Sequence, residues 1–127
     1  MPMKAIIAIG TNLNQRDNAL SVREYLGGMF GSDIVFTQFM KTKPVDGGDG
    51  YYINALAEIR TNMTYEALKQ WFKDLEHNCG RNQEDSGEGY IPVDIDILQY
   101  GDKRFKEEDW NRDYVKALWK ELKQKRK

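Results

Sequence analysis

The hydrophobic and polar positions along the chain follow two periods, about two residues for strands and about 3.6 for helices. The shorter period predicts strands at residues 92–100 (Pro-Val-Asp-Ile-Asp-Ile-Leu-Gln-Tyr) and 51–60, where apolar and polar side chains alternate. Runs rich in isoleucine, valine and phenylalanine predict two more strands at residues 4–9 and 34–40. Residues 65–79 carry apolar side chains at spacings of three and four, which predicts an amphipathic helix.

Two further helices complete this pattern. The first is expected to begin near Asp17 or Asn18, which are suitable N-cap residues, and to end at about Phe30. Its buried side is expected to carry Val22, Leu26 and Met29. The last helix is expected from about Asp109, and its apolar face comprises Trp110, Tyr114, Leu118 and Leu122.

The predicted elements follow one another as strand, helix, strand, strand, helix and strand, followed by the last helix. This is the order of the split βαβ, or ferredoxin-like, fold. We therefore expect one α+β domain over residues 1–127, with a four-stranded antiparallel sheet, helices on one face and an additional C-terminal helix. The other face is expected to stay open near two glycine-bearing loops at residues 41–50 and 81–92.

Asp94 and Asp96 are the candidate centre of the chemistry. Because side chains alternate along a strand, Val93, Ile95 and Ile97 would face the helices and the two aspartates would face the open side. Aspartate is depleted in strands, and neighbouring carboxylates repel each other unless a cation neutralises them. The pair therefore indicates a Mg²⁺ site for a phosphate-bearing substrate. The alternative is a solvated outer face without a function.

Tyr52 and Asn54 share one face of the strand expected at residues 51–60. An aromatic ring beside an amide that donates and accepts hydrogen bonds suits a planar heterocycle. The same residue types are equally compatible with an exposed sheet surface. An RNA-binding sheet is a further hypothesis, but this strand lacks the basic and aromatic pattern of such sheets.

The composition narrows these hypotheses. The 127-residue chain has 19 Lys and Arg against 20 Asp and Glu, so its net charge of −1 gives no general attraction to nucleic acid or acidic membranes. One cysteine, Cys79, and one histidine, His77, exclude an internal disulfide and a Cys/His zinc site. No apolar run is long enough for a membrane span and no signal-peptide pattern is found, so we expect a cytoplasmic monomer with small-molecule ligands.

A series of short motifs occurs in order along the chain. It comprises residues 8–13 (Ala-Ile-Gly-Thr-Asn-Leu), 42–44 (Thr-Lys-Pro), 52–55 (Tyr-Ile-Asn-Ala), Glu76 with Gly80 and Arg81, and 93–98 (Val-Asp-Ile-Asp-Ile-Leu) with Tyr100 and Gly101. Together these motifs resemble the 6-hydroxymethyl-7,8-dihydropterin pyrophosphokinase family of folate biosynthesis, over roughly residues 4–101. The resemblance implies the same ferredoxin-like fold that the periodicity predicts.

The resemblance also implies an activity, the transfer of diphosphate from ATP to the pterin hydroxymethyl group with release of AMP. Asp94 and Asp96 would bind two Mg²⁺ ions that bridge the ATP phosphates, and Arg81 would support catalysis. Glu76 and Ile97 would lie near the nucleotide. The pterin would be bound by Thr42, Lys43, Pro44, Val45, Tyr52 and Asn54.

The chain departs from the family where phosphate is expected to bind. Residues 81–91 carry one cation against three acids, and Gln83 and Ile91 stand where arginines are expected. After Gly101, an acidic stretch replaces the family's basic, histidine-bearing segment. The missing charge has candidate replacements in Lys41, Lys43, Lys103, Arg104 and Arg112. Two functions therefore stay open, an active pyrophosphokinase and a pterin-binding or regulatory module without transfer activity.

Overall fold

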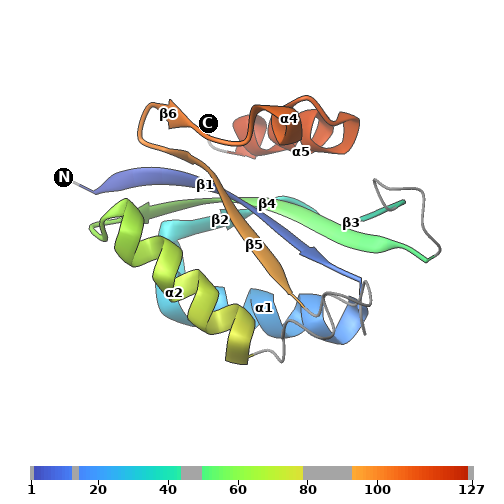
Figure 1. Ribbon diagram of the computed structural model, residues 1–127, viewed down its shortest axis with the longest axis horizontal. Helices are drawn as coiled ribbons and strands as arrows, with labels where there is room; N and C mark the ends of the chain where they lie inside the picture. Colours follow the sequence, from blue (N-terminus) through green and yellow to red (C-terminus); the bar gives the residue numbers. More distant parts are fainter. Residues whose placement is uncertain (1, 13–14, 44–49, 79–92, 126–127) are drawn as a thin grey trace.

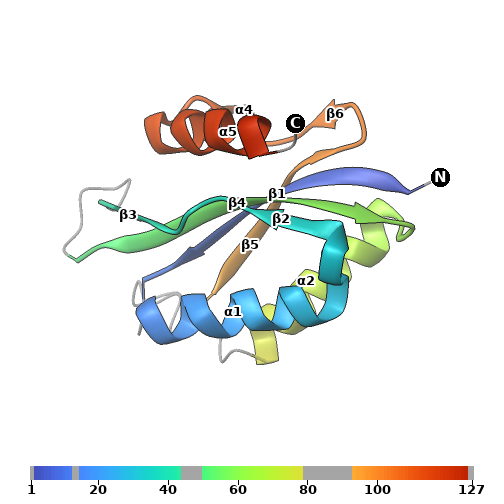
Figure 2. The same ribbon diagram turned by 180° about the vertical axis from the view of Figure 1, so that it is seen from behind.

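The computed structural model describes residues 2–12, 15–43, 50–78 and 93–125. Its elements are β1 (Met3–Thr11), α1 (Gln15–Phe30), η1 (Gly31–Asp33), β2 (Ile34–Phe36), β3 (Met40–Thr42), β4 (Tyr52–Thr61), α2 (Tyr65–Asn78), β5 (Asp94–Tyr100), β6 (Lys103–Arg104), α4 (Glu107–Trp110) and α5 (Asp113–Lys125). The sheet lies between α1 and α2 on one side and α4 and α5 on the other (Figure 1). The same three layers are visible from behind (Figure 2).

The sheet confirms the antiparallel α+β architecture but has six strands, so the expected number of four is wrong. The strand order is β2-β4-β1-β5-β6, and β3 also pairs with β4. The additional β6 forms a hairpin with β5, in which Gly101 takes a φ of +61°. A strand of two residues is too short for its hydrophobic period to be recognised.

The strand expected at residues 34–40 is divided into β2 and β3. Phe36 pairs with Ala57 of β4, and Met40 pairs with Asn54. Phe36 and Met40 are four positions apart and their partners three, so the segment between β2 and β3 contains one residue more than the paired part of β4. The chain departs from regular pairing at Thr37, whose hydroxyl accepts the backbone N–H of Leu56 at 2.9 Å. This irregularity is a bulge, and bulges redirect the side chains that follow them.

The core between the sheet and the first helical layer follows the predicted pattern closely. Its buried side chains include Ala5, Ile7 and Ile9 of β1, Val22, Leu26 and Phe30 of α1, Leu68, Phe72 and Leu75 of α2, and Ile95 and Ile97 of β5. Thr64 caps α2, because its hydroxyl accepts the backbone N–H of Ala67 at 3.1 Å. The expectation for Met29 is wrong, since its side chain is 50% exposed and Phe30 is buried instead.

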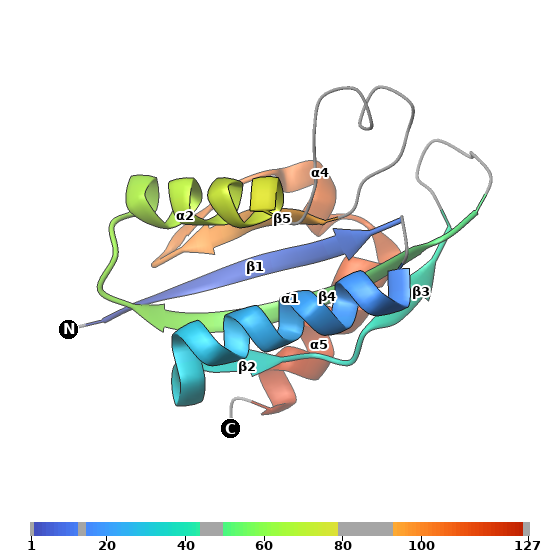
Figure 3. The ribbon, with the colours of Figure 1, turned by 90° about the horizontal axis from the view of Figure 1, so that it is seen from below.

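The expectation that helices cover only one face of the sheet is also wrong. Ile6, Leu56 and Leu98 point to the opposite face, where they form a second core with Trp110, Val115, Leu118 and Leu122. The physical reason is that β1, β4 and β5 carry apolar side chains on both faces, and the second set also has to be removed from water. Figure 3 shows α1 and α2 in front of the sheet and α5 behind it.

The C-terminal helix is divided as well. A turn at residues 111–112 separates α4 from α5, and this turn lies at the edge of the second core. None of the described helices is both long and apolar enough to cross a lipid bilayer.

Candidate functional site

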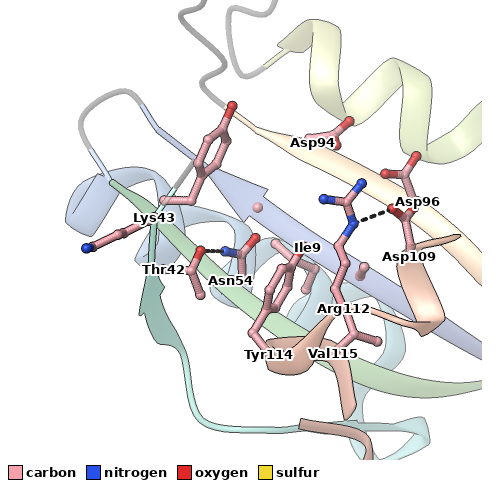
Figure 4. A pocket seen from close by; sticks show the side chains of 13 residues that line it. Ile9, Thr42, Lys43, Asn54, Asp94, Asp96, Asp109, Arg112, Tyr114 and Val115 are labelled. Atoms are coloured by element: carbon pink, nitrogen blue, oxygen red, sulfur yellow. Dashed lines mark hydrogen bonds and ion pairs between the residues drawn. The ribbon is translucent and has the colours of Figure 1, made fainter. Parts of the chain in front are cut away.

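A pocket of about 190 Å³ lies on the face of the sheet that carries α4 and α5, at the end of the sheet where β3 pairs with β4 (Figure 4). Its described walls come from β1, from the segment that ends β3, from β4 and β5, and from α4, α5 and the turn between them. They comprise Ala8, Ile9, Gly10, Thr42, Lys43, Tyr52, Asn54, Asp94, Asp96, Asp109, Arg112, Tyr114 and Val115. The C-terminal helices therefore leave this end of the sheet accessible and build one side of the pocket.

Asp94 and Asp96 lie on the pocket side of β5, whereas Val93, Ile95 and Ile97 are buried on the α1 and α2 side. The predicted orientation of this strand is confirmed. The pKa of Asp96 rises from 3.8 to about 6, first because burial disfavours the charged carboxylate and second because the charge of Asp94 is close. The two carboxylates thus form a partly buried site that favours bound positive charge.

Two basic side chains approach this acidic pair. Lys106 Nζ lies 3.5 Å from Asp96 Oδ1, and this contact raises the pKa of Lys106. Arg112 Nε donates to Asp109 Oδ1 at 2.9 Å, and Figure 4 shows the terminal nitrogens of its guanidinium extending toward Asp94 and Asp96. Asp109 therefore orients Arg112 toward the aspartate pair.

Asn54 and Thr42 form the opposite side of the pocket. Asn54 Nδ2 donates to Thr42 Oγ1, and Asn54 is only 9% exposed. Gly10, its partner on β1, leaves room for this amide, because a Cβ at residue 10 would lie 2.9 Å from Asn54 Oδ1. Tyr52, the partner of Thr42 on β4, also lines the pocket.

Tyr114 adds a second aromatic ring to the pocket. Figure 4 shows it between Asn54 and Arg112. Burial raises the pKa of Tyr114, so its hydroxyl keeps its proton at neutral pH. Two tyrosines and a buried amide make this side of the pocket suitable for a flat, polar-edged ring.

A second pocket of about 260 Å³ lies at the outer edge of β5, and Asp94 and Asp96 line it as well. Its other walls include Lys69, Lys73 and Glu76 of α2. Glu76 Oε2 accepts the backbone N–H of Ile95 at 2.7 Å, so its carboxylate fixes α2 to this strand edge. The aspartate pair therefore lies between an aromatic pocket and a pocket with two lysines.

The donor set at Asp94 and Asp96 fits Mg²⁺. Mg²⁺ is usually held by one or two carboxylates and completes its octahedral shell with water and substrate phosphate. The described residues contain no group of three or more His, Cys, Asp or Glu side chains arranged to hold a metal ion by themselves. A metal at this pair would complete its shell with water and with oxygen atoms of a bound substrate.

The structure brings most of the expected site residues together. Asp94, Asp96, Tyr52, Asn54, Thr42 and Lys43 line the first pocket, and Glu76 lines the second. Ile97 is buried in the core and is absent from the described walls of both pockets. The expectations for Arg81, Pro44 and Val45 fall outside the described residues.

The candidate replacement cations are distributed unevenly. Arg112 and Lys43 line the first pocket. The other three lie over aromatic rings instead, Lys41 over Tyr51, Lys103 over Phe105 and Arg104 over Trp110. Lys41, Lys103 and Arg104 are absent from the described walls of both pockets.

Sequence reasoning missed Lys106 and Asp109, and it assigned Tyr114 only to the apolar face of a helix. All three belong to the segment that differs from the family motifs, where no local signal predicts a site. The helical period of the last helix gives the one available signal. Val115 occupies the buried face of this helix beside Leu118 and Leu122, so Tyr114 is free to line the pocket.

Comparison with known proteins places these features in a family. A family model described as 7,8-dihydro-6-hydroxymethylpterin-pyrophosphokinase (HPPK) matches residues 6–124, which includes both C-terminal helices beyond the motifs at residues 4–101. A search of curated proteins finds no significant match. The family match supports pterin pyrophosphokinase activity in folate biosynthesis. With this coverage of its 127 residues, the chain belongs to the 7,8-dihydro-6-hydroxymethylpterin-pyrophosphokinase family.

Proposed function

We propose that the chain transfers diphosphate from Mg²⁺-bound ATP to 6-hydroxymethyl-7,8-dihydropterin. The pterin hydroxymethyl oxygen attacks the β-phosphorus, and the bond from this phosphorus to the oxygen that bridges the α-phosphate breaks. AMP leaves with that bridging oxygen, and the hydroxymethyl proton is released. The observation that carries this proposal is that the aspartate pair and the aromatic pocket share one cavity.

The aromatic side of the cavity accounts for pterin binding. Tyr52 and Tyr114 offer ring faces on which a pterin can stack, and Asn54 offers an amide that matches the donors and acceptors at the pterin edge. Thr42 takes the hydrogen bond from Asn54 and thereby fixes the direction of the amide. Because this amide is buried, a ligand without matching polar groups would offer no partner to the hydrogen-bonding capacity that Thr42 does not use, and it would bind poorly.

The nucleotide would approach the aspartate pair from the second pocket. Lys69 and Lys73 supply positive charge there, and Arg112 extends toward the pair from the first pocket. These cations would offset the acidic character that the sequence shows in residues 81–91. Glu76 fixes the edge of β5 along which the nucleotide would lie.

Asp94 and Asp96 would hold Mg²⁺ between the two pockets. The bound ion would neutralise charge on the phosphate oxygens and align them with the attacking hydroxyl. The chain's own residues would place the two substrates in line, and positioning of this kind accounts for a large part of the rate enhancement in phosphoryl transfer.

A coupled assay of AMP release tests the proposal, with ATP, MgCl₂ and 6-hydroxymethyl-7,8-dihydropterin as substrates. We expect AMP formation that requires both the pterin and Mg²⁺. Asp94→Asn should lower kcat about 100-fold or more, since it removes a charged metal ligand. Asp33→Asn, an exposed aspartate of η1, is the matched control and should keep wild-type activity.

Pterin binding measured by calorimetry on the same samples separates the two candidate functions. Folded wild-type protein that binds the pterin but forms no AMP would overturn the proposed transfer. That result would instead support a pterin-binding or regulatory module.

A further inference from the structure

Lys106 has a backbone conformation that is unusual for its residue type. Its φ of 54° and ψ of 59° lie in the left-handed region, and no other non-glycine residue among those described has a positive φ. This region is sterically unfavourable for every residue that has a Cβ, and glycine is normally preferred there. Strained backbone of this kind is concentrated at functional sites. The conformation of Lys106 therefore indicates that its side chain has a role in the site.

The neighbours of Lys106 hold it in this conformation from both sides. The carbonyl of Leu98 accepts the backbone N–H of Phe105 at 2.9 Å and the indole N–H of Trp110 at 3.0 Å. Phe105 is also stacked on Tyr65, with ring centroids 4.7 Å apart. Leu98 follows Asp96 by two residues on β5, so these bonds place Lys106 beside Asp96.

The side chain of Lys106 is directed at Asp96, with Nζ 3.5 Å from Oδ1. We propose that Lys106 is a resident counter-ion of the aspartate pair, which offsets one of its two negative charges until the nucleotide arrives. This inference rests on the proposed function, since it takes Asp94 and Asp96 as the metal site. The side chain of Lys106 is 47% exposed, so water partly screens this contact.

The counter-ion has opposite effects on the two ligands. Mg²⁺ alone has to displace the ammonium from Asp96, and the two cations repel each other, so Lys106 weakens binding of the free metal. A nucleotide brings phosphate oxygens that accept the displaced ammonium, so Lys106 strengthens binding of the Mg²⁺–nucleotide complex. The site thereby favours metal that arrives together with phosphate over metal that arrives alone.

Substitution of Lys106 by glycine removes the positive charge without disturbing the left-handed backbone, so it tests the effect of the charge on ligand binding separately from folding. Glycine adopts the left-handed conformation without strain, and this gain opposes the loss of the partly screened ion pair with Asp96, so Lys106→Gly should stay folded with a melting temperature close to that of wild type. For MgCl₂ alone, followed by NMR titration because weak binding is expected, the Kd of Lys106→Gly should fall about threefold to tenfold relative to wild type. For a non-hydrolysable ATP analogue with Mg²⁺, its Kd should rise about tenfold.

Two further variants make the experiment specific. Lys106→Arg keeps the cation and should stay close to wild type in both titrations. Lys103→Ala removes the same charge from β6, where Lys103 lies over Phe105, and should change neither Kd by more than about twofold. Equal Kd values for MgCl₂ in wild type and Lys106→Gly, or the same direction of change for both ligands, would overturn the inference.

The failure of the inference is distinguishable from failure of the proposed function. If wild-type protein binds neither Mg²⁺ nor the Mg²⁺–nucleotide complex, the metal site itself is refuted, and the counter-ion with it. If it binds both and Asp94→Asn abolishes this binding while Lys106→Gly changes nothing, only the role of Lys106 is refuted.

Discussion

Asp96 makes the metal-free protein sensitive to pH through a single carboxyl group. Its pKa is about 6 in the folded protein against 3.8 as the ordinary value, so the folded form binds this proton more tightly than the unfolded chain does. The free energy of unfolding contributed by this group is therefore highest below pH 4, and it is lost as the pH rises toward and through 6. Asp96 destabilises the metal-free protein at neutral pH.

Asp96→Asn should consequently raise the free energy of unfolding at pH 7 by about 1–2 kcal/mol, a value reduced from the full shift because a third of the side chain is exposed. Urea unfolding in EDTA at pH 4 and at pH 7 measures this, and the gain should shrink at pH 4. Glu24→Gln, on the exposed side of α1, is the control and should show no such difference. A loss of stability at pH 7 in Asp96→Asn would contradict the prediction.

The same residue shows why part of the site could be predicted from sequence. Aspartate is rare in strands, so two aspartates within one strand indicate a function. The alternation of side chains along the strand then predicts the face on which they lie. Tyr52 and Asn54 could be added because they alternate in the same way. Lys106, by contrast, reaches Asp96 through a turn whose course depends on Trp110 and Phe105, and no period in the sequence reports such a contact.

At the scale of elements, β1, β3 and β4 have to approach closely to build the side of the pocket that is proposed to bind the pterin. Asn54 of β4 pairs with Gly10 on one side and with Met40 on the other, and its amide fills the space above Gly10. A Cβ at residue 10 would meet Asn54 Oδ1 at 2.9 Å, closer than real side chains approach. The glycine of the motif at residues 8–13 is therefore explained by the amide across the ladder.

Gly10→Ala should displace the Asn54 amide and disrupt its hydrogen bond to Thr42. We expect the KM for the pterin to rise about tenfold, which corresponds to the loss of one or two neutral hydrogen bonds, while the KM for ATP changes little. Steady-state kinetics with each substrate varied in turn measures the two values.

Gly27→Ala provides the matched control for this substitution. A Cβ at residue 27 of α1 would meet no atom within 4 Å, so alanine should leave both KM values unchanged and slightly raise stability in the helix. Equal effects of the two substitutions on the pterin KM would show that Gly10 has no special relation to Asn54.

Helices and strands that bury one face and expose the other could be predicted from the sequence, because their apolar residues recur with a regular period. The strands and helices around the first core have a clear period, and their positions agree with the structure within a few residues. The second core was missed because the face of the sheet that carries Leu56 and Leu98 was expected to stay open, although both residues are apolar. A strand with apolar residues on both faces indicates a covering layer on each side, and Trp110 of α4 together with α5 supplies the second layer here.

At the scale of the whole molecule, α5 links the second core to the functional site. Its buried side holds Val115, Leu118 and Leu122 against the sheet, while Tyr114 at its N-terminal end lines the pocket. The first helical layer lies on the opposite face of the sheet (Figure 3). Ligand binding should therefore stabilise the layer of α4 and α5 more than it stabilises α1.

Hydrogen–deuterium exchange measured by mass spectrometry tests this asymmetry. With pterin and a Mg²⁺–ATP analogue each at ten times its Kd, amides that exchange by local opening of residues 107–116 should slow about tenfold or more, because the ligands bind only the closed form. Peptides of α1 should change little, and Asp94→Asn with the same ligands should lose most of the protection. Because Lys69, Lys73 and Glu76 of α2 line the second pocket, some protection of α2 is also expected, whereas protection confined to α1 would contradict a site on the α5 face. Such a result would require the substrates to bind between α1 and the sheet, where the described side chains form a buried apolar core.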